Sequence, residues 1–143
     1  MKNVIVLLFL LPTVLFAQDK YFTKSGNASF YSSTSFEDIE ATNKSVTGVF
    51  DSKTGKIEFS MLIRSFEFEK KLMQEHFNEN YMESEKYPKA TFEGTVTNMS
   101  DIDLKKDGTY SAKTEGKLTI HNVTKEVKET ASFTVKDGKI SAK

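Results

Sequence analysis

The sequence of 143 residues contains no cysteine and no tryptophan, and it has only two histidines. Without cysteine the chain forms no disulfide, and zinc sites built on thiolates are excluded. A metal site would have to combine His76 or His121 with carboxylates such as Glu75 or Glu79. No nucleophile motif accompanies either histidine. We therefore expect no catalysis, no metal and no cofactor; a hydrolase or metalloenzyme, in which both histidines converge with carboxylates, is the weaker alternative.

The chain also lacks an excess of charge of either sign, because 20 lysines and arginines balance 20 aspartates and glutamates. Proteins that bind nucleic acid through its phosphates carry strongly basic surfaces. The composition therefore predicts no nucleic-acid partner. It also predicts no electrostatic attraction to an anionic membrane.

Long apolar runs are missing except at the N-terminus. Lys2 precedes an apolar run from Val4 to Phe16, with Pro12 inside it, and the small residue Ala17 follows. This pattern is typical of a secretory signal peptide, and the run is shorter than the ~20 residues of a membrane-spanning helix. We expect residues 1–17 to be a cleaved signal peptide. Residues 18–143 would then be one periplasmic or secreted domain that is not an integral membrane protein.

After this leader, apolar and charged residues alternate in several segments, and turn residues such as Asp137 and Gly138 separate them. One long face consists of Tyr110, Ala112, Thr114, Gly116, Leu118 and Ile120. A later one consists of Val127, Ala131, Phe133 and Val135, with the charged Glu129 as the exception. Such a period of two residues predicts antiparallel strands with one wet face, and six to eight strands favour a sandwich or a barrel. The many lysines and glutamates of the polar face argue against a barrel in a membrane.

Small residues share the apolar faces with aromatic ones. Gly48, Gly94 and Gly116 alternate with residues such as Phe50 and Phe92. Small residues on the inner face of a barrel either let the strands bend or leave volume for a ligand. The pattern alone does not choose between these two roles.

The alternation stops between residues 65 and 88. Four residues there have the spacing of one helical face: Leu72, Met73, His76 and Phe77. Asn80 and Glu83 have the spacing of an N-cap and its partner, which predicts a second short helix that ends before Pro88. We expect a short helical insertion around residues 69–86 that covers one mouth of the barrel, with His76 inside its apolar stripe.

Two motifs resemble the signatures of the YceI-like family. EHFNENYMESEKYPKATFEG, residues 75–94, is similar to a helical segment with a histidine that leads to Tyr-Pro and a strand with phenylalanine. GKLTIHNVTKEV, residues 116–127, is similar to a strand that ends Leu-Thr-Ile-His and returns through Val-Thr-Lys. FYSSTSFEDIEATN, residues 30–43, resembles the first loop of an exported subgroup.

The resemblance implies an all-β, lipocalin-like antiparallel β-barrel. Its interior would hold a polyisoprenoid or another long-chain lipid without catalysis. Family members usually continue for some tens of residues beyond the position where this sequence ends. We therefore expect a barrel that is incomplete at the C-terminus and lacks its last strands. Asn122 stands where many members have glycine, which asparagine replaces because it tolerates positive φ. The alternative is an exported structural or stress-related β-barrel with a filled core and a protein partner.

The predicted ligand lining combines inner-face residues with residues of the insertion. It consists of Phe59, Met61, Ile63, Phe66, Phe68, Leu72, Met73, Phe77, Phe92, Leu118, Ile120 and Phe133. His76 and Arg64 are predicted to meet the polar end of the ligand, since an arginine pairs with phosphate in bidentate fashion. Phe66 and Phe68 break the parity of the preceding strand, which indicates a bulge or a position on the rim.

Overall fold

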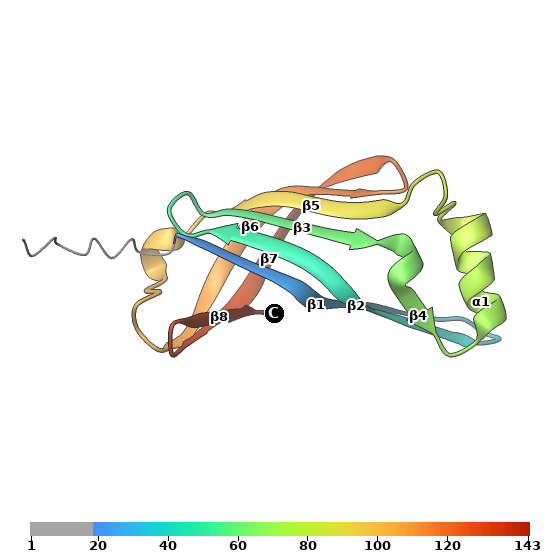
Figure 1. The fold of residues 1–143 in the computed structure, drawn as a ribbon, viewed down its shortest axis with the longest axis horizontal. Helices are drawn as coiled ribbons and strands as arrows, with labels where there is room; N and C mark the ends of the chain where they lie inside the picture. The colour runs from blue at the N-terminus through green and yellow to red at the C-terminus, as the bar shows by residue number, and fades with distance from the viewer. Residues whose placement is uncertain (1–18) are drawn as a thin grey trace, which may run out of the picture.

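The computed structural model of the chain describes residues 19–143, so the predicted signal peptide lies outside the described residues. Its eight strands form a single antiparallel sheet that curls into a nearly closed barrel (Figure 1). The strands are β1 (Lys20–Ser33), β2 (Asp38–Asp51), β3 (Lys56–Leu62), β4 (Phe66–Phe68), β5 (Lys89–Val96), β6 (Gly108–Ile120), β7 (Val123–Lys136) and β8 (Lys139–Ala142). The helical elements are η1 (Ile63–Ser65), α1 (Lys71–His76), η2 (Phe77–Tyr81) and η3 (Met99–Asp101). The predicted all-β barrel with a short helical insertion is confirmed.

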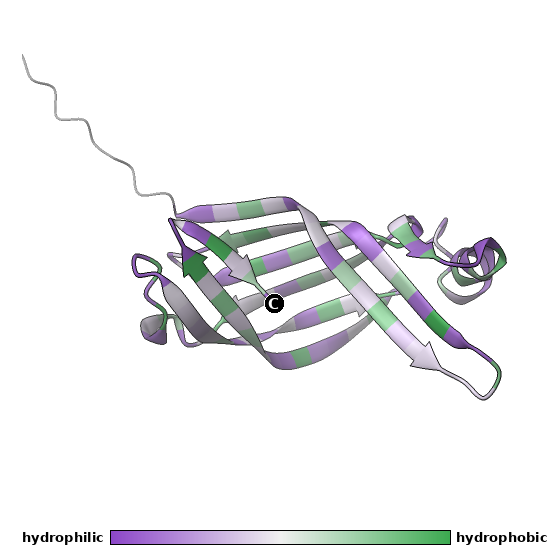
Figure 2. Ribbon diagram, turned by 90° about the horizontal axis from the view of Figure 1, so that it is seen from below, coloured by the Kyte–Doolittle hydropathy of each residue, from purple (hydrophilic) through white to green (hydrophobic). Residues whose placement is uncertain are grey.

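The strands follow one another around the barrel in the order β1-β2-β3-β5-β6-β7-β8, and β4 pairs with β2. Within the described part of the chain, β1 and β8 are the two ends of the sheet and do not pair with each other. Figure 2 looks onto this open side, where the strands of the far wall are visible between β1 and β7. The absence of further strands from the domain stays a prediction. No helix within residues 19–143 is long and apolar enough to cross a membrane.

Tight turns connect the hairpins because their residues accept positive φ. His121 and Asn122, between β6 and β7, have φ of 50° and 59°. Asp137 and Gly138, between β7 and β8, have φ of 52° and 75°. Two successive residues with φ above zero give the type I′ geometry that matches the twist of paired strands. Asn122 thus adopts the positive φ that this turn requires.

A kink in β2 explains why β3 and β4 do not form one strand. Thr47 to Phe50 pair with β3, whereas residues 41–43 pair with β4. Asn43 lies at the kink and is fully buried. Its Nδ2 donates to the carbonyl of Leu62 at 2.9 Å, and its Oδ1 accepts from the backbone N–H of Ser45 at 3.0 Å. The chain leaves β3 through η1 and returns to β2 as β4, which produces the change of parity before Phe66.

The inner face of the barrel is packed at both ends. Near η3 a hydrophobic core contains Phe50, Ile57, Val96, Ile102, Ala112 and Phe133. At the opposite end four rings form an aromatic cluster: Phe30, Phe66, Phe68 and Phe77. The sequence did not reveal Phe30, because residues 30–43 resemble a loop. In the structure only residues 34–37 form a turn there, and the rest belongs to β1 and β2.

The helical insertion is one continuous segment rather than two helices. α1 passes directly into η2, a π-helical turn that contains Asn80. Glu83 has φ of 45°, which lies outside the right-handed helical region, so the predicted second helix is wrong. The expected position of His76 inside an apolar stripe is also wrong. His76 is exposed, and Leu72 is 63% exposed, because the helix packs through Phe77 instead.

Candidate functional site: an open apolar surface inside the barrel

Between the two packed ends, the inner face forms an open apolar surface. We call it the inner apolar surface; its residues are Phe59, Met61, Phe92, Leu118 and Val127. The strand registers place Phe59 beside Phe92 and Phe92 beside Leu118. The rings of Phe59 and Phe92 stack with centroids 6.2 Å apart. Three neighbouring strands therefore contribute one continuous row of apolar side chains.

Three glycines let these rings lie flat against the sheet. A Cβ on Gly94 would lie 2.7 Å from Cζ of Phe92, and one on Gly116 would lie 2.8 Å from the same atom. A Cβ on Gly48 would lie 2.8 Å from Cδ1 of Phe59. Each distance is shorter than a van der Waals contact, so a side chain there would displace the ring. The small residues make room for phenylalanine rings of the protein itself, a role that the sequence pattern did not suggest.

The inner apolar surface is half-buried and reaches the solvent. Its five residues have intermediate exposure, unlike the core residues near η3. Towards the β6–β7 turn the same face is more open still, with Ile120 at 37% and Val123 at 54% exposed. A ligand that covers such a surface is stabilised by about 25 cal/mol for each Å² of apolar area that it removes from water. The surface therefore has the chemistry to bind a long hydrocarbon chain.

The other predicted lining residues lie at the two ends. Ile63 and Phe66 are buried at the helical end, and Phe133 is buried in the core near η3. Phe68 and Phe77 pack on each other with centroids 4.9 Å apart. Met73 is half-buried on α1. These residues belong to the two packed ends or to the helix, whereas Phe59, Met61, Phe92 and Leu118 belong to the inner apolar surface.

A polar hollow of about 600 Å³ lies beside the helical insertion. It is lined by Arg64, Ser84 and Lys86 and by four glutamates, Glu75, Glu79, Glu83 and Glu85. Arg64 donates to Oε1 of Glu85 at 2.9 Å and to Oγ of Ser84 at 3.4 Å. Arg64 thus already has a partner within the protein, and an anionic head group would have to compete with Glu85 for it.

The helical cover, which we define as residues 70–88 and which includes α1 and η2, is held to the barrel by polar contacts on two sides. On one side Nε2 of His121 lies 2.7 Å from Oε2 of Glu83. The ring of Tyr87 packs edge-on against the imidazole of His121, with the ring centroids 4.7 Å apart. On the other side Lys70 pairs with Glu37 in the β1–β2 turn. This hydrogen bond and the charge of Glu37 raise the pKa of Lys70.

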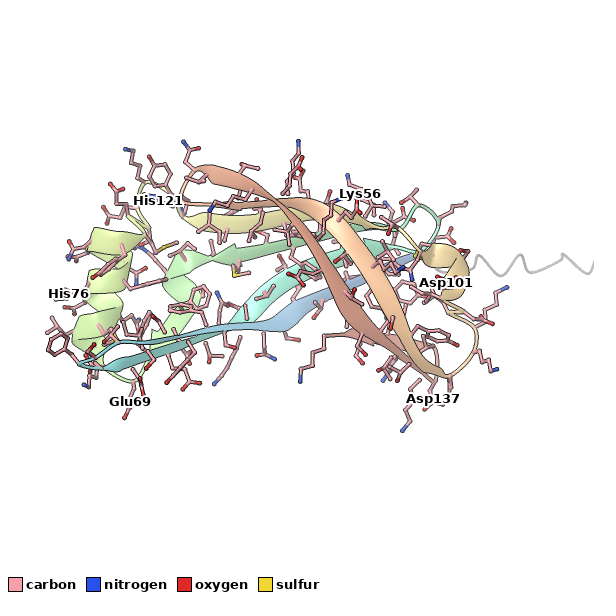
Figure 3. The ribbon with its side chains drawn as sticks, turned by 180° about the vertical axis from the view of Figure 1, so that it is seen from behind. Lys56, Glu69, His76, Asp101, His121 and Asp137 are labelled. Atoms are coloured by element: carbon pink, nitrogen blue, oxygen red, sulfur yellow. The ribbon has the colours of Figure 1, made fainter. Side chains whose placement is uncertain are left out.

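The two histidines do not converge. Figure 3 shows His76 on the outer side of the helical segment and His121 at the tip of the β6–β7 hairpin. Within residues 19–143, no group of three or more histidines, aspartates and glutamates is placed to hold a metal ion. His121 has a clear role as the contact between the hairpin tip and Glu83.

Comparison with known families decides the identity of the fold. The chain matches the YceI-like domain over residues 22–143. This chain belongs to the YceI-like family. Its expected resemblance is thereby confirmed over nearly all of the described residues. A comparison with curated proteins found no match.

Several solved structures are similar to this chain at low sequence identity. A polyisoprenoid binding domain from Saccharophagus degradans, implicated in plant cell wall breakdown, has a TM-score of 0.70 and 11% identity, covering 84% of this chain and 70% of that chain. The YceI protein of Campylobacter jejuni has a TM-score of 0.45 and 16% identity, covering 93% of this chain and 69% of its own. Burkholderia cenocepacia BcnA has a TM-score of 0.41 and 14% identity, covering 79% and 57%. At 11% identity, the likeness to the first of these shows the fold alone.

Proposed function

We propose that this YceI-like protein is a periplasmic or secreted carrier that binds a polyisoprenoid or a similar long-chain lipid without changing it chemically. The observation that carries the proposal is the row of half-buried apolar side chains on the inner apolar surface. The polyisoprenoid binding domain from Saccharophagus degradans, which has the same fold, supports the choice of ligand class. The N-terminal signal pattern supports export.

The ligand chain lies along the sheet, against Phe59, Phe92 and Leu118, and extends past Ile120 towards the hairpin tip. Each buried CH₂ group contributes about 0.8 kcal/mol. A single isoprene unit therefore contributes several kcal/mol before the cost of ordering the chain is subtracted. Apolar contact alone is enough for affinity, and no catalytic group is needed.

The two packed ends of the barrel agree with the alternative function, a structural protein with a filled core, but the half-buried inner apolar surface between them does not. A core that served only to stabilise the fold would bury Phe59 and Phe92 as fully as it buries Phe133. Instead both rings keep contact with the solvent. The half-buried middle therefore favours a ligand over a purely structural role.

The test is organic extraction of the protein, purified from an exporting host, followed by mass spectrometry. We expect a long-chain lipid at close to one molecule per protein. Phe92→Glu should lose this lipid, because a charge would then lie in the apolar row. Thr95→Glu is the matched control, since Thr95 is exposed on the other face of the same strand. A wild-type protein that is extracted empty, and that also fails to take up added polyprenol, would contradict the proposal.

A further inference from the structure

The inner face of the sheet is almost free of charge. Along β3, β5, β6 and β7, the positions that share a face with Phe59 and Phe92 include only two charged side chains, Lys125 and Glu129. Both lie on β7. The sequence pattern singled out Glu129 as an exception. Lys125 joins it because β7 begins at Val123, four residues before Val127, where the sequence pattern begins.

Lys125 ends the row that contains the two stacked rings of Phe59 and Phe92. Its partner on β6 is Leu118, which in turn pairs with Phe92. The aliphatic stem of a lysine packs well along apolar surface while its ammonium group stays available for an anion. The row therefore presents hydrocarbon along its length and one positive charge at its β7 end.

The ammonium group of Lys125 has no hydrogen bond and no ion pair with any of residues 19–143. Lys128, three residues further along the same strand, differs in this respect. It lies on the outer face and pairs with Glu115 at 3.4 Å. Lys125 is exposed, so its charge is available to a molecule on the inner apolar surface.

Glu129 places a negative charge on the same face of β7 as Lys125, so the two ends of the inner apolar surface differ in charge. It lies four residues from Lys125, which corresponds to about 13 Å of extended strand, and its partner on β6 is Thr114. Its carboxylate repels an anion at the end of the surface that borders the packed core. An anionic group is thus favoured beside Lys125 and disfavoured beside Glu129.

We propose that Lys125 selects amphiphiles with an anionic head group, such as a phosphate or a carboxylate. It holds this head group near the β6–β7 hairpin, with the apolar tail against Leu118 and Phe92. The inference rests on the proposed function and specifies its ligand class. A charge-assisted hydrogen bond from an ammonium group to phosphate is among the strong ones in proteins.

The experiment compares two probes with the same tail, farnesyl phosphate and farnesol, in direct binding titrations below their aggregation concentrations. The wild-type protein should bind farnesyl phosphate more tightly, by on the order of tenfold. Lys125→Gln should abolish this preference while leaving the affinity for farnesol within about twofold. Lys128→Gln, on the outer face of the same strand, should keep the preference.

Lys125→Glu supplies a second variant, for which farnesol should become the better ligand. The preference of the wild type should also weaken as salt is added, because the contact is partly exposed. Equal binding of both probes by wild type and Lys125→Gln would overturn this inference alone. It would assign Lys125 the simpler role of an inward-pointing charge that protects an edge strand. A wild type that binds neither probe would overturn the proposed function, and this inference with it.

Discussion

The two ends of β7 contribute to the same inner face, yet they differ sharply in burial. Phe133 is 1% exposed, whereas Val123 is 54% exposed. Near Phe133 the strand has β8 beside it, and Ile102 and Leu104 from the connection around η3 pack onto the core. Near Val123 the strand pairs only with β6 among the described strands. An alternating pattern thus determines which way a side chain points, but its neighbours determine whether it is buried.

The largest expected effect tests the packed half of this comparison. Phe133→Ala should lower the free energy of unfolding by ~3–5 kcal/mol, because it leaves a cavity in a core that cannot easily collapse. Phe92→Ala should cost clearly less, since its ring is already partly exposed to the solvent. Urea denaturation of both variants measures the difference. Equal losses would mean that the middle of the barrel is as tightly packed as its end.

The next effect concerns the glycines under the phenylalanine rings. A Cβ on Gly116 would lie 2.4 Å from the carbonyl oxygen of Glu93 and 2.6 Å from Cα of Gly94. Gly116→Ala should therefore cost ~1–3 kcal/mol through overpacking. The same denaturation experiment with Lys117→Ala, at the adjacent exposed position, should show a change within about 0.5 kcal/mol. A harmless Gly116→Ala would show that the strands and the ring of Phe92 move apart easily.

The open end depends on the turn that closes the β6–β7 hairpin. Asn122 has φ of 59°, so Asn122→Val should cost roughly 1–2 kcal/mol, because a β-branched residue fits poorly in the left-handed region. Asn122→Gly should be neutral or slightly stabilising, since glycine adopts this conformation freely. Thermal unfolding separates the two variants. If valine were tolerated as well as glycine, the turn would not hold the open end in place.

The smallest expected effect concerns the contact between the hairpin tip and the helical cover. His121→Gln should change the free energy of unfolding by no more than about 1 kcal/mol, because His121 and Glu83 are both partly exposed. Hydrogen exchange should nevertheless become faster in residues 82–87. His76→Gln is the control, since His76 is exposed on the helical segment. Unchanged exchange in the first variant would show that Phe77 and the pair of Lys70 with Glu37 hold the cover without the histidine.

Much of the fold follows from the sequence because it depends on local rules. Alternation predicted the strands, and Asp137 and Gly138 predicted a hairpin turn. The loss of alternation predicted the position of the helical segment. Each of these signals involves residues that are close in the sequence, so the elements can be predicted without knowing which distant segments pack against them.

The remaining features depend on contacts between distant segments. Asn43 fixes the kink of β2 by bonding to Leu62, which is 19 residues away. His76 has suitable spacing for a buried stripe, but the helix packs through Phe77, so His76 faces the solvent. Lys125 lies beside Leu118, at the end of the row that contains Phe92, only because β7 pairs with β6 in one register. Such properties are set by tertiary packing, and a single sequence does not display them.

The central claim is that a long apolar chain binds on the inner face of the barrel. The absence of native cysteine allows one probe to be attached at a chosen position, at Val123→Cys on the inner face or Thr124→Cys beside it on the outer face. With an environment-sensitive fluorophore on each, added polyprenol should shift the emission to the blue at position 123 and leave position 124 unchanged. No shift at either position, or equal shifts at both, would contradict the claim.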